Sequence, residues 1–296
     1  MESSRYQERA KLYLDKFTGL KTVEPVAVRL VKMINEDTSS LKEFEAVIRA
    51  DPTLVLRILK LINSSYFSLR TKIKSVSEAI AYIGMDNLRN MIVLDAVKNI
   101  FSQDSSTPEF SRKRLWAHCA VTSICCQMVA ERIFARKGED YFLCGILHDT
   151  GLIVEDQVAP EKFKTFCRTF SPQTQALTEH EQMVMGTDHT IIGYLLTLKW
   201  GMEPDLCRGI KYHHNILNEV EPHSHAGILQ IAEYLAARIG YEAFPEIHTR
   251  IGSPLLLSHI KENIMEYRAI ADDMPQEIQR VREIYALGDD DADESV

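Results

Sequence analysis

The sequence predicts an all-α protein built as a two-lobed helical bundle. Apolar residues recur at the three-to-four-residue spacing of helices along almost the whole chain, for example at Val47, Leu54, Ile58, Leu61 and Ile62. Alternating runs rich in β-branched residues, which would predict strands, are nearly absent. With 296 residues and a hydrophobic content of 45%, the chain can bury a large core, which excludes a disordered or fibrous protein.

Prolines mark the expected starts of several helices. Pro25 and Pro204 fit the first turn of a helix, where the missing backbone N–H costs no hydrogen bond. Asp51-Pro52 predicts another helix start, with the Asp51 side chain as a cap for the free amides. We therefore expect short helices joined by tight turns.

Two polar intervals divide the chain. The serine-rich stretch over residues 101–109 separates long periodic segments and predicts a boundary between one lobe over residues 1–105 and another over 106–288. Residues 241–288 predict two or three amphipathic helices that close the second lobe. Residues 289–296 are almost all acidic or small and predict a disordered acidic tail.

Charge and hydropathy exclude two broad classes of protein. The net charge of −8 repels a phosphate backbone, and the short basic clusters at 70–74 and 112–114 are too small to predict generic nucleic-acid binding. No stretch approaches about 20 uninterrupted apolar residues, and no signal peptide opens the chain. We expect a cytoplasmic protein with no membrane segment.

The six cysteines predict reduced core thiols. They form no C-x-x-C pair, and most of them lie among apolar residues. Neither a disulfide framework nor a zinc–thiolate site is indicated.

All ten histidines lie in the predicted second lobe, several of them on the apolar faces of helices. His118 shares a helical stripe with Thr122, Cys125 and Val129, and His148-Asp149 ends an apolar run that starts at Tyr141. His189, His213 and Glu233 stand on similar stripes farther along the chain. Each residue alone is more often a satisfied core or surface residue than a ligand.

Taken together, these residues predict a metal centre. A buried polar side chain loses its hydration unless it pairs with another group or with a cation. Imidazoles and carboxylates brought from several helices suit one or two transition-metal ions, namely iron, manganese or zinc. We expect six side chains to converge at a common point, with His214 close by. These are His118, His148, Asp149, His189, His213 and Glu233.

Two motifs resemble the HDOD (HD-related output domain) family. The helix that starts at Asp51-Pro52 ends in Asn63-Ser64, and the run Ser75-Val-Ser-Glu-Ala-Ile-Ala-Tyr-Ile-Gly84 follows it. A second stretch from Gly186 to Pro204, followed by Ile210-Lys-Tyr-His213-His214, is similar to that family as well. The resemblance covers roughly residues 20 to 240. It implies an N-terminal HDOD helical lobe beside an HD-like helical lobe, in a bacterial signal-transduction protein.

The run Gly145-Ile-Leu-His148-Asp149-Thr-Gly151 resembles the signature of the HD phosphohydrolase superfamily. This resemblance implies that His118 is the first metal histidine, that His148 and Asp149 are the pair that names the superfamily, and that Glu233 stands where its last aspartate stands. His189 and the pair His213-His214 resemble the additional histidines with which HD-GYP phosphodiesterases hold a second metal.

Two departures from the HD-GYP pattern argue against hydrolysis. Leu152 stands where those enzymes usually carry a lysine, and Asn215-Ile-Leu-Asn218 replaces their Gly-Tyr-Pro loop. Without that cation and that loop, the charge of a phosphate is less well neutralised. Metal binding does not depend on either feature.

Three hypotheses for the function remain open. The first is a non-catalytic or weakly catalytic signalling module that binds a protein partner, with a nucleotide as an alternative ligand. The second is a metal-dependent phosphohydrolase or phosphodiesterase, supported by the full ligand set. In the third, a metal ion or a hydrogen-bonded histidine cluster only pins helices together.

Overall fold

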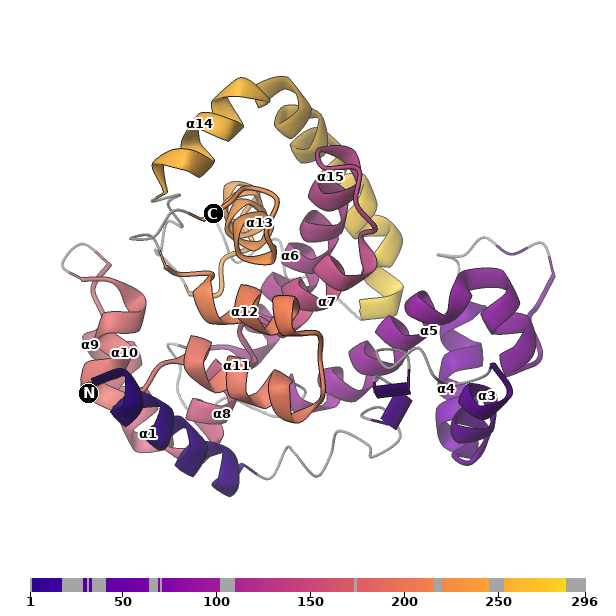
Figure 1. Ribbon diagram of the computed structural model, residues 1–296, viewed down its shortest axis with the longest axis horizontal. Helices are drawn as coiled ribbons and strands as arrows, with labels where there is room; N and C mark the ends of the chain where they lie inside the picture. The colour runs from indigo at the N-terminus through magenta and orange to yellow at the C-terminus, as the bar shows by residue number, and fades with distance from the viewer. Residues whose placement is uncertain are drawn as a thin grey trace.

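The computed structural model describes residues 2–17, 29–30, 32–33, 41–63, 69, 71–101, 110–172, 175–215, 220–244 and 253–285. Every regular element among these residues is a helix (Figure 1). The predicted all-α fold is confirmed. The expected helix start at Pro25, the boundary near residue 105 and the tail over 289–296 lie outside the described residues.

A small lobe is formed by α3 (Leu41–Arg49), α4 (Pro52–Ile62) and the first part of α5 (Val76–Phe101). It stands apart from the rest of the molecule, on the right in Figure 1. Helix α4 begins at the predicted position, and the Asp51 carboxylate accepts a hydrogen bond of 3.1 Å from the Leu54 amide. The α4 residues that face α3 and α5 are fully buried and apolar, so packing holds this lobe together.

Asn63 closes the end of α4. Its side-chain amide donates to the carbonyls of Leu59, at 2.7 Å, and of Ile73, at 2.8 Å. Its side-chain oxygen accepts from the Ile73 amide at 2.9 Å. The side chain therefore satisfies backbone groups at the helix end and fixes the segment that leads into α5. Ser64, its partner in the sequence motif, lies outside the described residues.

Helix α5 is interrupted at Gly84, where φ is 81° and ψ is 168°. A Cβ atom added there would meet nothing within 4 Å, so the backbone angle and not the available space requires glycine. The part of α5 before the kink contacts α3, where the Ser77 hydroxyl donates to Glu45. The part after the kink contacts α4 through the ion pair of Asp95 with Arg57, and it also contacts α7.

Helix α6 (Arg112–Arg132) is the centre of the large lobe, and most of its residues are buried. It packs against α7 (Glu139–Leu147), α13 (His225–Arg238) and α15 (Ile264–Tyr285). The remaining helices of this lobe complete the shell around it: α8 (Thr150–Val158), α9 (Pro160–Thr169), α10 (Leu177–Met185), α11 (His189–Lys199), α12 (Pro204–Tyr212) and α14 (Pro254–Glu262). Pro204 occupies the first turn of α12, as predicted.

The first helix, α1 (Glu2–Lys16), packs against α8 and α11 of the large lobe (Figure 1). The sequence division into residues 1–105 and 106–288 placed it in the small lobe. The physical reason for its position is an apolar face that includes Ala10 and Leu14, together with the buried Tyr13 hydroxyl, which donates to the Met185 carbonyl at 3.0 Å.

A buried ion pair in the large lobe lies next to the end of α5. The Arg112 guanidinium lies 2.6 Å from the Asp156 carboxylate, which ties α6 to α8. Arg112 also donates to the carbonyl of Ile100, near the end of α5. The end of α5 is therefore held by a charged side chain of the large lobe.

Five of the six cysteines are buried and none forms a disulfide, as predicted. Among the described residues, none of the helices combines the length and the apolar character needed to span a bilayer.

Candidate metal centre

The seven predicted ligands lie together where six helices meet. His118 comes from the middle of α6, and His148 and Asp149 occupy the turn between α7 and α8. His189 opens α11, His213 and His214 follow α12, and Glu233 lies in α13. All of these side chains are buried except that of His214, which is partly exposed.

The ligands form two groups on either side of Asp149, and not one group around a single point. The Oδ2 atom of Asp149 faces His118 and His148, whose Nε2 atoms lie 3.6 and 3.3 Å away. Glu233 completes this first group, with its Oε1 3.6 Å from the Nε2 of His148.

The other oxygen of Asp149, Oδ1, faces the second group. The Nε2 atoms of His189 and His213 lie 3.4 and 3.6 Å from it, and His214 adds a third imidazole. Oδ1 is buried and accepts no hydrogen bond. A buried carboxylate oxygen without a donor is costly, and a cation at this position would remove the cost. Asp149 thus offers one carboxylate oxygen to each of the two groups.

Hydrogen bonds to the far side of the rings set the orientation of four histidines. The Nδ1 atoms of His118, His148 and His213 contact the carbonyl oxygens of Tyr241, Gly145 and Ile210 at 2.9, 2.7 and 2.6 Å. The Nδ1 atom of His189 contacts the Glu181 carboxylate at 2.7 Å. Since a carbonyl can only accept, each Nδ1 next to one carries the ring proton.

The Nε2 atoms of His118, His148 and His213 therefore carry lone pairs, and the four Nε2 atoms, that of His189 included, face one another in pairs. The Nε2 atoms of His118 and His148 are 3.1 Å apart, and those of His189 and His213 are 3.3 Å apart. Two lone pairs at this distance repel each other, so each pair needs a proton or a metal ion between its nitrogens. Outer hydrogen bonds of this kind orient histidines that bind metals.

Electrostatics within the first group favours a bound cation. Burial alone would lower the pKa of His148, but Asp149 and Glu233 outweigh it and raise that pKa to about 9. Burial lowers the pKa of His118 to about 4, with His148 adding to the effect. Although burial opposes the charge on Asp149, His148 holds its pKa well below the usual range. The negative charge of Asp149 and Glu233 thus favours a proton on His148, and a metal ion could take the place of that proton.

Two further carboxylates extend the second group, and the sequence analysis missed both. Glu181 is fully buried and accepts from the backbone amide of His189, at 3.2 Å, as well as from its ring. Glu155 is fully buried beside it. Burial and the neighbouring Glu181 raise the pKa of Glu155 well above the usual value, and burial and Asp188 raise that of Glu181. Burial thus disfavours the charged form of both carboxyls.

The helical spacing of these carboxylates carries a weak signal for their burial. Glu181 shares a face of α10 with Leu177 and Met185, four residues away on either side. Glu155 shares a face of α8 with Leu152 and Val158. A carboxylate on an apolar stripe is the same pattern that singled out Glu233.

Gly151 lets α8 approach the start of α11. A Cβ atom at this position would lie 2.6 Å from the Cα of His189. Any side chain there would push α11 away, so the second group requires glycine two residues after Asp149.

Cys119 lies next to the first group. Its Sγ is within 4.8 Å of ligand atoms of His148 and Asp149. Burial raises the pKa of this thiol well above the usual value. A protonated thiol is a poor metal ligand, so the donors remain nitrogen and oxygen.

Comparison with known proteins gives a family and a fold. The HDOD domain model matches residues 20–216, which is more than half of the chain. An uncharacterized protein of Treponema pallidum (strain Nichols) is 23% identical over 204 residues, which cover 68% of this chain and 39% of that protein. The matched region is thus well under two thirds of that relative's length.

Two solved structures share the fold. A candidate phosphohydrolase from Shewanella amazonensis SB2B is 23% identical with a TM-score of 0.70, and the match covers 95% of this chain and 98% of the other. An HDOD domain protein with unknown function from Geobacter sulfurreducens is 21% identical with a TM-score of 0.67, over 92% and 99% of the two chains.

Proposed function

The chain belongs to the HDOD domain family, and we propose that it is a signal-transduction protein whose large lobe binds one or two transition-metal ions. One observation carries this proposal. Three buried imidazoles have their Nδ1 atoms committed to carbonyl acceptors, and their Nε2 lone pairs lie around a carboxylate with an oxygen that accepts no hydrogen bond from the described residues. A cation satisfies all of these groups at once.

The residues present fit first-row transition metals. His118, His148 and Glu233 would hold one ion, His189, His213 and His214 the other, and Asp149 would serve both. Mixed nitrogen and oxygen donors suit iron, manganese or zinc and not magnesium or calcium. Bound ions would supply positive charge able to polarise a phosphate or to activate water.

A regulatory role is favoured over hydrolysis by what surrounds the cluster. Leu152, at the position where HD-GYP enzymes carry a lysine, is fully buried in the core. In the described part of the chain, the ion pairs of the seven ligands involve only histidine, aspartate and glutamate. Among the described residues, no lysine or arginine is paired with these ligands and so placed by them to neutralise a phosphate. The lobes would instead act on a protein partner.

A metal-dependent phosphohydrolase is the second candidate. It is favoured by the placement of Asp149 between two groups of donors, which is the arrangement of two-metal hydrolases. The similar Shewanella amazonensis protein, described as a candidate phosphohydrolase, is consistent with it.

Turnover assays separate the two candidates. Protein reconstituted with iron, manganese or zinc is incubated with cyclic dinucleotides and with a simple phosphomonoester. We expect no multiple-turnover hydrolysis, because Leu152 stands where HD-GYP enzymes carry a lysine and no described lysine or arginine is paired with the ligands. Multiple turnover that disappears in His148→Ala would contradict the regulatory proposal and establish the enzyme.

A further inference from the structure

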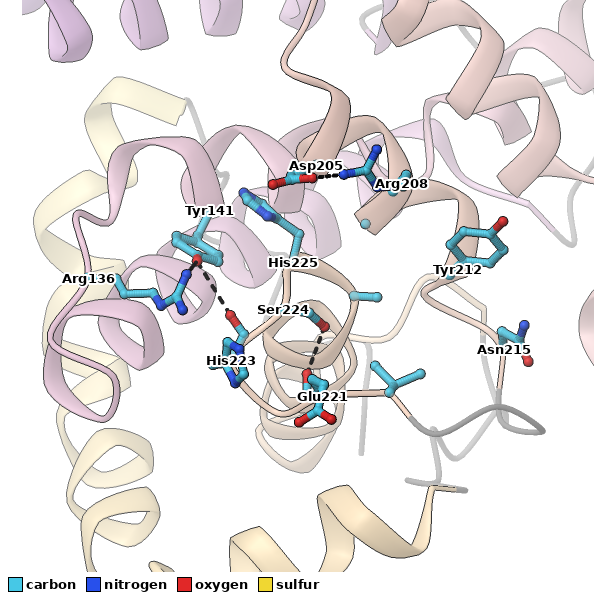
Figure 2. A pocket seen from close by; sticks show the side chains of 13 residues that line it. Arg136, Tyr141, Asp205, Arg208, Tyr212, Asn215, Glu221, His223, Ser224 and His225 are labelled. Atoms are coloured by element: carbon cyan, nitrogen blue, oxygen red, sulfur yellow. Dashed lines mark hydrogen bonds and ion pairs between the residues drawn. The ribbon is translucent and has the colours of Figure 1, made fainter.

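A cavity of about 500 Å³ opens beside α12. Its walls come from the start of α7, from α12 and from the turn that leads into α13 (Figure 2). None of the seven candidate metal ligands lines it. A ligand in this cavity would therefore occupy a second site.

The inner wall of the cavity is aromatic and tightly packed. The ring of His225 stacks on the ring of Tyr141, with centroids 4.3 Å apart and planes 12° from parallel. Gly209 permits this packing, because a Cβ atom there would lie 2.5 Å from the Cβ of His225 and 3.0 Å from the Sγ of Cys144. The wall is preformed and would lose little entropy on binding.

Arg136 supplies a positive charge at the rim. Its guanidinium donates to the Tyr141 hydroxyl at 3.1 Å, and among the described residues it forms no ion pair with a carboxylate. Arg208, the other arginine of the cavity, is paired with Asp205. The N–H groups that Arg136 does not use for Tyr141 remain available to an anion.

The first turn of α13 adds backbone donors next to Arg136. Ser224 caps the helix, and its Oγ accepts from the Gly227 amide at 3.1 Å. The amides of His225 and Ala226, the first two residues of the helix, have no partner within it. Both residues line the cavity, so the positive end of the α13 dipole faces the same space as the guanidinium.

The other residues that line the cavity restrict the charge and the size of a ligand. Tyr212 presents a second aromatic ring, and Asn215 a side-chain amide, on the side opposite Arg136 (Figure 2). Asp205 and Glu221 place two carboxylates at the rim, which disfavours a polyanion such as a triphosphate or a nucleic-acid backbone. The volume lies within the range of small-molecule pockets.

We propose that this cavity binds a small ligand with one phosphate group and one planar ring, of the size of a nucleoside monophosphate. The phosphate contacts Arg136 and the first amides of α13. The ring lies between Tyr212 and the Tyr141–His225 stack, where Asn215 can bond to its edge. Because Tyr212 and Asn215 flank His213 and His214 in the chain, the ligand touches the turn that carries two candidate metal ligands.

Calorimetry with AMP and GMP tests the proposal, with adenosine and inorganic phosphate as the two halves of the ligand. We expect AMP or GMP to bind the wild-type protein more tightly than either half. Arg136→Gln should weaken this binding about tenfold or more, the loss expected for a hydrogen bond to a charged group. The matched control is Lys137→Gln, which removes the same charge from an exposed neighbour outside the cavity and should bind like wild type.

The variant His148→Ala/Asp149→Ala separates this site from the metal centre. We expect it to keep the nucleotide affinity of the wild type, whatever its metal content. Failure of AMP and GMP to bind at millimolar concentration would overturn the proposal. Binding that is lost in this variant but unchanged in Arg136→Gln would also overturn it, because the ligand would then sit at the metal centre.

Discussion

The small lobe of α3, α4 and the first part of α5 and the large lobe around α6 are both helical, but they bury different side chains. Among the described residues 41–83, every fully buried side chain is apolar. Among its described residues, the large lobe buries metal-ligand candidates and four further carboxylates, Glu155, Asp156, Glu181 and Asp188. An apolar side chain is stabilised by burial alone, whereas each buried polar group requires a partner. The small lobe can therefore be explained by packing, and the large lobe cannot.

The largest effect we predict from this contrast is on stability in the small lobe. Leu54 is 1% exposed, and Leu54→Ala should lower the free energy of unfolding by about 2–5 kcal/mol, because it removes buried carbons and leaves a cavity. Denaturant unfolding measures the loss. The matched control is Leu56→Ala on the same helix, where the side chain is 69% exposed and the change should be within about 0.5 kcal/mol.

The metal content of Leu54→Ala tests whether the two lobes are independent. Folded Leu54→Ala protein should bind as much metal as wild type, because Leu54 does not touch the cluster. If its metal content fell in step with its stability, the two lobes would not be separable in the way we describe.

A smaller effect is predicted for Glu181→Gln, in the large lobe. The amide oxygen can still accept from His189 but brings no negative charge to strengthen the ring as a donor, so affinity for the ion of the second group should fall about 10–100-fold. Competition with a chelator measures this affinity. Glu179→Gln changes an exposed carboxylate on the same helix and should leave the affinity unchanged. Equal affinities of both variants and wild type would show that Glu181 does not support a metal ligand.

The smallest effect that we predict is on the free energy of unfolding and concerns the small lobe. Asp51→Ala removes the cap of α4 and should lower the free energy of unfolding by about 1 kcal/mol. Asp51→Ser keeps an oxygen for the Leu54 amide and should recover most of that loss. A larger loss in the serine variant than in the alanine variant would show that the cap is not what matters at this position.

The features that could be predicted from the sequence are those that depend on neighbours along the chain. Helical spacing gave the all-α fold, and the start of α4 at Pro52 followed from the residue pair Asp51-Pro52. The same spacing identified the side chains that meet at the metal centre, since polar residues on apolar stripes must turn inward.

Other features depend on contacts that the sequence does not display. The two-group arrangement follows from the way Asp149 points one oxygen to each side. The ring protons are fixed partly by backbone carbonyls, such as those of Gly145 and Tyr241, which any residue type could supply. The position of α1 on α8 and α11 depends on packing between distant segments, which local periodicity cannot specify.

Elemental analysis of the protein tests the central claim most directly. Wild-type protein purified without added metal, and then reconstituted with iron, manganese and zinc, is compared with His148→Ala/Asp149→Ala treated identically. Circular dichroism shows whether the variant keeps its helices. We predict that wild type holds one or two transition-metal ions per chain and that the folded variant loses them. Equal metal content in both proteins, or none in either after reconstitution, would contradict the metal centre and leave a hydrogen-bonded cluster of buried histidines.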